Sequence, residues 1–128
     1  MGERPVTVLT VDDQQVFRRA ARKLIAATPG FLQVGEAASG RQAVKLAAEL
    51  RPDMVLVDVR MPGMDGLETT RRLAATTPDA VVVLISMEEV PELPSAIGSV
   101  GAATHVRKQS LSTEALQEIW NTHGASAR

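Results

Sequence analysis

The chain of 128 residues contains no cysteine and no tyrosine, and aromatic residues make up only 2% of it. Without cysteine it can form neither a disulfide framework nor a thiolate metal site. Stacking platforms for nucleic-acid bases are not expected, because they are built from aromatic side chains. The formal net charge of -1 gives no electrostatic reason to bind nucleic acid or an anionic membrane. We therefore expect no direct contact of this domain with either.

Long hydrophobic runs are also missing. No apolar stretch is long enough to cross a bilayer, and no signal peptide precedes the first apolar run, so we expect a cytoplasmic protein. Hydrophobic residues still make up 45% of the chain, which is enough for a core. The sequence predicts one domain over residues 1–124, and residues 125–128 are a terminal tail or the start of a linker.

Five apolar runs alternate with five segments whose apolar residues have helical spacing. Strands are predicted at residues 6–11, 32–37, 54–57, 81–85 and 103–107, and helices at residues 14–27, 41–50, 66–76, 88–100 and 113–121. The helix at 88–100 should be short, late-starting or irregular, because Pro91, Pro94 and Gly98 weaken its pattern. The alternation predicts an α/β fold with a doubly wound parallel sheet and helices on both faces.

Polar residues follow the carboxyl ends of four of the predicted strands. They are Asp12, Asp13, Asp58, Ser86 and Lys108. In an open parallel sheet, ligands bind beyond those ends, where the strand order reverses. The five side chains can therefore meet in one crevice although they lie far apart in the sequence.

Asp58 ends the apolar run at residues 54–57, which is expected to be buried on both faces. An isolated buried carboxylate costs several kcal/mol unless a partner neutralises it, so Asp58 is either a cap near the surface or a functional group. Asp65 is the better cap for the next helix, since Glu68 follows it at the spacing of a capping box. This leaves Asp58 free for chemistry.

Three carboxylates in one crevice repel one another, and a hard divalent cation such as Mg²⁺ would relieve that repulsion. Lys108 adds a positive charge and Ser86 a hydroxyl donor. A carboxylate nucleophile, a metal, a lysine and a hydroxyl are the equipment for in-line phosphoryl transfer to a carboxylate. Asp58 is the best nucleophile, because Asp12 and Asp13 lie together as metal ligands.

Each of these residues also has an ordinary structural interpretation. Asp13 could cap the helix at 14–27, Ser86 could be a simple strand-end hydroxyl, and Lys108 could be a solvated surface residue. The convergence of all five residues favours the functional interpretation.

The chain resembles the receiver domain of two-component response regulators over nearly its whole length. The matching motifs are Asp12-Asp13, Val57-Asp58, Met61-Pro62-Gly63-Met64-Asp65-Gly66, Ser86 and Lys108. The resemblance implies a flavodoxin-like fold with strand order 2-1-3-4-5. It also implies Mg²⁺-dependent transfer of a phosphoryl group to Asp58, from a sensor histidine kinase or a phosphotransfer protein.

The resemblance assigns further roles by position. The implied metal ligands are Asp12, Asp13, Asp58 and the main-chain carbonyl of Arg60, while Ser86 and Lys108 would hold the phosphoryl oxygens. The surface of helix four, strand five and helix five would report phosphorylation or form a homodimer. Residues 108–112, Lys-Gln-Ser-Leu-Ser, resemble the subgroup whose receivers precede a helix-turn-helix domain, so a covalently linked DNA-binding domain is an implied partner.

Two departures from the family pattern keep other functions open. His105 stands where the family usually has a Tyr or Phe switch residue, and Met87 stands where a small residue is usual. A receiver-like interaction module that no longer switches is therefore the alternative. A hydrolase of the aspartyl-phosphate type would need a second Asp two residues after Asp58, where this chain has Arg60, so no turnover of an external substrate is expected.

Three residues should lie at the mouth of the crevice: Arg60, Met87 and Glu88. We expect Arg60 and Glu88 to form an ion pair that, with Met87, slows the entry of water to the acyl phosphate. Its contribution to stability would be small, about 0–1 kcal/mol.

The helix at 14–27 carries basic residues outside its apolar face. They are Arg18, Arg19, Arg22 and Lys23. We expect a solvated face, and the resemblance implies docking of the kinase as the alternative.

Overall fold

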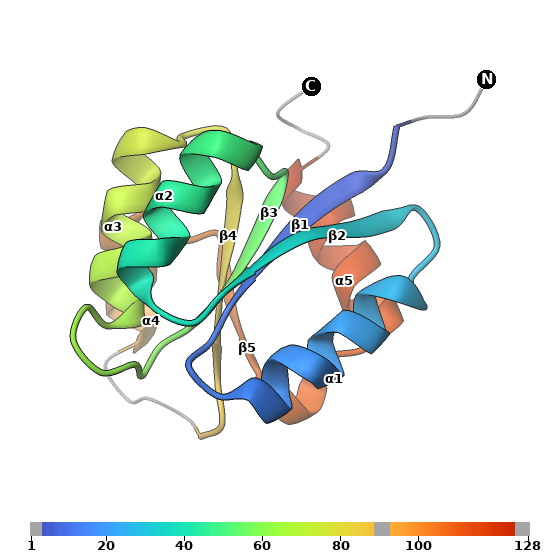
Figure 1. The fold of residues 1–128 in the computed structure, drawn as a ribbon, viewed down its shortest axis with the longest axis horizontal. Coiled ribbons are helices and arrows are strands. Elements are labelled where there is room, and N and C mark those ends of the chain that lie inside the picture. The colour runs from blue at the N-terminus through green and yellow to red at the C-terminus, as the bar shows by residue number, and fades with distance from the viewer. Residues whose placement is uncertain (1–3, 89–92, 125–128) are drawn as a thin grey trace.

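Strands and α-helices alternate along the chain in the computed structural model, which describes residues 4–88 and 93–124 (Figure 1). Within these ranges the elements are β1 (Val6–Val11), α1 (Gln15–Ala26), β2 (Phe31–Ala37), α2 (Gly40–Leu50), β3 (Met54–Asp58), α3 (Gly66–Thr76), β4 (Val81–Ser86), α4 (Leu93–Val100), β5 (Thr104–Arg107) and α5 (Thr113–Ile119). The 3-10 helix η1 (Lys108–Ser110) follows β5, and the π-helix η2 (Trp120–Gly124) continues α5. The predicted alternation is confirmed.

The strands form a parallel sheet in the order β2-β1-β3-β4-β5. This order confirms the flavodoxin-like arrangement that the resemblance implied. The order reverses between β1 and β3, because the chain passes from β1 to β2 on one side and returns to β3 on the other. In such sheets the carboxyl ends of the strands at the reversal point border the ligand crevice.

The strand register places the predicted site residues. Val11 of β1 lies opposite Val57 of β3, so the residues that follow them, Asp12 and Asp58, are neighbours. On the other side of β3, β4 and β5 extend the same parallel alignment. The residues at the ends of these four strands therefore lie along one edge of the sheet, as predicted.

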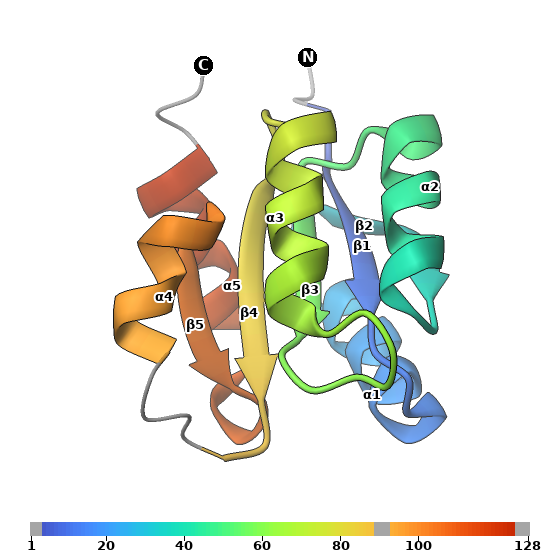
Figure 2. The same cartoon turned by 90° about the vertical axis from the view of Figure 1, so that its left-hand side faces the viewer.

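Helices cover both faces of the sheet (Figure 2). α2, α3 and α4 lie on one face, and α1 and α5 lie on the other. Successive residues of β3 point to opposite faces: Val55 and Val57 join the core under α2, α3 and α4, whereas Met54 and Leu56 join the core under α1 and α5. All residues of β3 are buried, so Asp58 ends a strand that is enclosed on both faces.

The cap of α3 forms as predicted, but the capping box does not. Asp65 accepts a hydrogen bond from the main-chain N–H of Glu68 at 2.9 Å. The carboxylate of Glu68 instead pairs with Arg71 at 2.6 Å and Arg72 at 3.0 Å. Asp65 is therefore occupied as a helix cap, which leaves Asp58 for another role.

α4 is described from Leu93 to Val100, and Glu88, the first residue of the predicted helix, is not helical. The start that the prolines predict falls at residues that the structure does not describe. Pro91 and the predicted tail at residues 125–128 lie outside the described residues. Among the residues that the structure describes, no helix has the length and hydropathy that a membrane span requires.

Gly66 allows α3 to begin directly against the end of β3. Its main-chain N–H donates to the carbonyl of Val59 at 2.9 Å. A Cβ atom at this position would lie 2.1 Å from the carbonyl oxygen of Asp58 and 2.6 Å from the Cα of Val59. Both neighbours are backbone atoms, so a side chain would force the loop away from Asp58.

We expect Gly66→Ala to lower the free energy of unfolding by about 2 kcal/mol or more, because it forces overpacking against backbone. Urea denaturation measures this change. Gly98→Ala in α4 is the matched control: its Cβ would meet nothing within 4 Å. That variant should keep or raise stability, by up to about 1 kcal/mol, through helix propensity. Equal free energies of unfolding of the two variants would show that the loop between β3 and α3 can shift to make room for a side chain without loss of stability.

Candidate functional site

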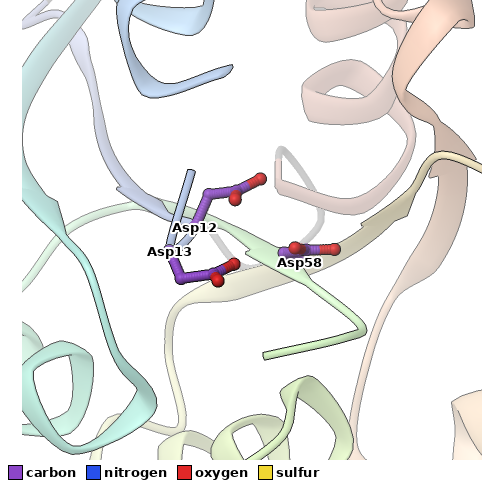
Figure 3. A group of neighbouring side chains, drawn as sticks. All are labelled: Asp12, Asp13 and Asp58. Carbon is purple, nitrogen blue, oxygen red and sulfur yellow. The ribbon is translucent and has the colours of Figure 1, made fainter. Parts of the chain in front are cut away.

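Three carboxylates lie together at the ends of β1 and β3 (Figure 3). Asp12 and Asp13 extend from the end of β1, and Asp58 lies beside them at the end of β3. Each offers a carboxylate oxygen within 4.8 Å of the others. Asp12 and Asp58 are buried, with exposed fractions of 0% and 6%, while Asp13 is exposed. The predicted convergence of the three acids is therefore confirmed.

Main-chain N–H groups hold two of these carboxylates in place. Asp12 Oδ1 accepts the N–H of Gln14 at 2.8 Å, and Asp58 Oδ1 accepts the N–H of Arg60 at 3.3 Å. Gln14 occupies the N-cap position of α1 without a side-chain cap, so Asp13 is not the cap of this helix. The carboxylate of Asp13 is thus available at the crevice.

Lys108 is the one cation that forms an ion pair with these carboxylates among the described residues. Its Nζ atom lies 2.6 Å from Asp12 Oδ2 and 3.8 Å from Asp58 Oδ2. The Lys108 side chain is only 6% exposed, so it is not a solvated surface residue. The ammonium also lies over the ring of Phe17, 4.4 Å from the ring centroid. Lys108 therefore belongs to the crevice, nearer to Asp12 than to Asp58.

The crevice raises the pKa of the Asp58 carboxyl from the usual 3.8 to about 6. Burial is the main cause, because it removes water from the ionised form, and the nearby charge of Asp12 adds to it. Lys108 and the N–H of Arg60 act in the opposite direction but do not cancel the rise. One buried lysine thus leaves the three acids incompletely neutralised.

The donor set fits a hard divalent cation. Asp12 Oδ2 is buried, and within the described part of the chain its one partner is the Lys108 ammonium, which does not meet it in good hydrogen-bond geometry. Carboxylate oxygens are the ligands that Mg²⁺ prefers, and the ion would supply the missing positive charge. Asp12, Asp13 and Asp58 are the residues that would hold it. The carbonyl of Arg60 as a fourth ligand stays a prediction.

Ser86 and His105 form a polar link between β4 and β5. The Ser86 hydroxyl donates to the main-chain oxygen of Glu88, and His105 Nε2 lies 2.7 Å from the same hydroxyl. A hydroxyl has one hydrogen, which is directed at Glu88, so His105 Nε2 must carry a proton and donate. His105 is half-buried, and it contacts the strand-end hydroxyl of β4 directly.

The predicted ion pair at the mouth of the crevice is wrong. Arg60 and Glu88 are both exposed, and among residues 4–88 and 93–124 neither forms a salt bridge. An exposed pair gains too little to hold two long side chains in one geometry. Met87 is 63% exposed, so it lies at the surface beside Ser86.

Sequence reasoning missed two residues of α1. The helical spacing of Phe17 among apolar residues indicates only core packing, but its ring contacts the Lys108 ammonium. Arg18 was assigned to a solvated face, but its Nη1 donates to the Asp12 carbonyl at 2.6 Å and its Nε lies 3.6 Å from Glu36. The available signal was their place: both lie within the first turns of the helix that follows the acidic pair.

Comparison with known proteins gives one consistent result. The family model described as "Response regulator receiver domain" matches residues 8–120. Response regulator GacA of Pseudomonas aeruginosa is 40% identical over 114 residues, which are 89% of this chain and 53% of that protein. Response regulator UvrY of Escherichia coli is 34% identical over 114 residues, 89% of this chain and 52% of that protein.

Solved structures show the same likeness. A two-component response regulator of the LuxR family, from an Aurantimonas species, superposes with a TM-score of 0.85 at 29% identity, covering 97% of this chain and 88% of that one. The chain spans about half the length of the curated relatives it matches.

We expect Asp58→Asn to stabilise the protein at pH 7.5 in the presence of a metal chelator. The folded protein binds the Asp58 proton more tightly than the unfolded chain, so ionisation of Asp58 costs stability above pH 6. The shift corresponds to at most about 3 kcal/mol. The difference between wild type and variant should fade as the pH falls from 6 toward 4, because the folded protein then holds the Asp58 proton and the cost of ionising Asp58 in the folded state is lost.

Urea denaturation from pH 4 to pH 8 measures this difference. Asp79→Asn is the control, because Asp79 is an exposed turn residue and should give no pH-dependent gain. A wild-type protein more stable than Asp58→Asn at pH 7.5 without metal would contradict the proposed repulsion.

Proposed function

Since the chain belongs to the response regulator receiver domain family, we propose that it accepts a phosphoryl group on Asp58 and switches a signalling surface in response. The observation that carries the proposal is the meeting of Asp12, Asp13 and Asp58 with the buried ammonium of Lys108. The donor is a phosphohistidine of a sensor kinase or of a phosphotransfer protein, and the transfer takes place in the cytoplasm.

In the proposed transfer, an ionised Asp58 oxygen attacks the phosphorus atom of the phosphohistidine. An O–P bond forms as the P–N bond breaks, and the bonding electrons stay on the imidazole nitrogen. The other ring nitrogen keeps its proton, so neutral imidazole leaves and Asp58 becomes an acyl phosphate. Asp58 needs no base, because a pKa of about 6 leaves it mostly ionised at neutral pH.

The other residues of the crevice hold the transferred group. Bound Mg²⁺ would offset the negative charges of the carboxylates and the phosphoryl oxygens. Lys108, with its Nζ atom 3.8 Å from Asp58 Oδ2, is placed to pair with a phosphoryl oxygen. Ser86 would donate its hydroxyl to another, which requires it to leave the carbonyl of Glu88.

The switch in this proposal is the link between Ser86 and His105. When the Ser86 hydroxyl turns to the phosphoryl group, its oxygen moves relative to His105 Nε2. The hydrogen bond that His105 donates to this oxygen is then altered. The change then reaches β5 and the surface of α4, β5 and α5, where a partner, a second copy or a linked DNA-binding domain would respond.

The alternative is a receiver-like module that binds a partner without switching. The observation that favours it is the existing pair of hydrogen bonds at Ser86, which already satisfies the hydroxyl without a phosphoryl group. In either case we propose no turnover of an external substrate.

We expect one phosphoryl group to be added when the protein is incubated with Mg²⁺ and phosphoramidate. Intact mass spectrometry measures the product, and a chelator should abolish it. Asp58→Asn should prevent the addition, whereas Asp65→Asn should not, because asparagine also caps helices well. Wild-type protein that stays unmodified, or an Asp58→Asn protein that is still modified, would overturn the assignment.

We expect Ser86→Ala to uncouple His105 from the phosphoryl site. Beryllofluoride with Mg²⁺ mimics the acyl phosphate, and NMR of the imidazole nitrogens follows His105. In wild type the His105 signals should shift on addition, and in Ser86→Ala this shift should be lost although beryllofluoride still binds. His123, in η2, is the internal reference. A wild-type protein that binds beryllofluoride without any shift at His105 would favour the non-switching module.

A further inference from the structure

We propose that Phe17 is a positioning residue for Lys108. Its ring face attracts the Lys108 ammonium in the crevice, and the contact persists while the ammonium shifts from Asp12 toward a phosphoryl group on Asp58. The proposal rests on the proposed function of Asp58. It assigns a role in the phosphoryl site to α1, through a residue whose pattern in the sequence indicates only core packing.

The geometry of Lys108 is the first support. An ammonium has three N–H donors, and with a side chain only 6% exposed Lys108 has little water to receive them. Among the carboxylates of the described residues, only that of Asp12 lies within hydrogen-bonding distance, with Oδ2 at 2.6 Å, since Asp58 Oδ2 is at 3.8 Å. The negative face of the Phe17 ring, 4.4 Å away, takes the place of the missing partner.

The movement of Lys108 is the second support. The ammonium now lies closer to Asp12 than to Asp58, so pairing with a phosphoryl group on Asp58 requires a shift between the two. A hydrogen-bond acceptor would hold the ammonium in one direction. A ring face attracts a cation over a broad area, so the attraction persists through a small lateral shift.

The position of Phe17 explains how the ring stays in place. α1 begins at Gln15, two residues after Asp13, and Phe17 packs against the core cluster under α1 and α5. Phe31 packs against the same cluster from β2 and is also half-buried. No cation lies over its ring in the described part of the chain. Phe31 is therefore a matched control for packing without a cation.

Fluorinated phenylalanines, introduced at position 17 alone, test the proposal. Added fluorine weakens the negative ring face stepwise while the size of the ring changes little. The first readout needs neither metal nor phosphodonor: acetylation of each lysine by an amine-reactive reagent, followed by peptide mass spectrometry. Lys23 and Lys45 are exposed and serve as internal references. The second readout is the rate of phosphorylation by phosphoramidate with Mg²⁺.

From phenylalanine to trifluorophenylalanine at position 17, acetylation of Lys108 should rise about threefold or more, and the phosphorylation rate should fall in the same order. The same series at position 31 should change neither. Phe17→Trp should keep the wild-type behaviour and Phe17→Leu should resemble the trifluoro protein. If Phe17→Leu does not fold, the fluorinated series at position 17 still tests the proposal.

Equal effects of the two fluorinated series, or no effect of either, would reduce Phe17 to core packing and overturn the proposal. Failure of the proposed function of Asp58 would give a different pair of results. In that case the wild-type protein would take up no phosphoryl group at all, while acetylation of Lys108 still followed the fluorine content at position 17. That result would overturn the motion toward Asp58 and with it the proposal as stated.

Discussion

The repulsion between the carboxylates of Asp12, Asp13 and Asp58 is the constraint on which the rest of the crevice depends. The acids lie within 4.8 Å of one another, and two of them are buried. In the described part of the chain a single ammonium, that of Lys108, pairs with them, and it lies closer to Asp12. Burial raises the pKa of Asp58 to about 6, the charge of Asp12 adds to the rise, and Lys108 does not cancel it. A divalent cation would offset the excess negative charge, which is why the acceptor chemistry is proposed to require one.

The fold prevents the acids from relaxing apart. β3 is enclosed by helices on both faces, and its register with β1 keeps Asp12 beside Asp58. Gly66 brings the start of α3 against the carbonyl of Asp58, so the loop after β3 cannot move toward the strand or accept a side chain there. The packing of the core therefore keeps the buried carboxylates of Asp12 and Asp58 close together.

α1 connects the acidic edge to the rest of the molecule. Phe17 faces the ammonium of Lys108, and Arg18 joins the carbonyl of Asp12 to Glu36 near the end of β2. Arg22 pairs with the same Glu36 at 2.6 Å. A partner that docks on this helix would therefore press on residues that hold the site, and not only on a solvated basic face.

The sequence by itself determined the order of strands and helices, the cap at Asp65 and the strand ends that carry Asp58 and Lys108. These features depend on neighbouring residues, whose apolar spacing and cap chemistry can be recognised along the chain. Only the tertiary structure decided which partners the side chains take. It paired His105 with Ser86, left Arg60 unpaired with Glu88 and set Lys108 closer to Asp12 than to Asp58. Those choices depend on distances of 2 to 4 Å between segments far apart in the chain, and they follow from how helices pack on the sheet.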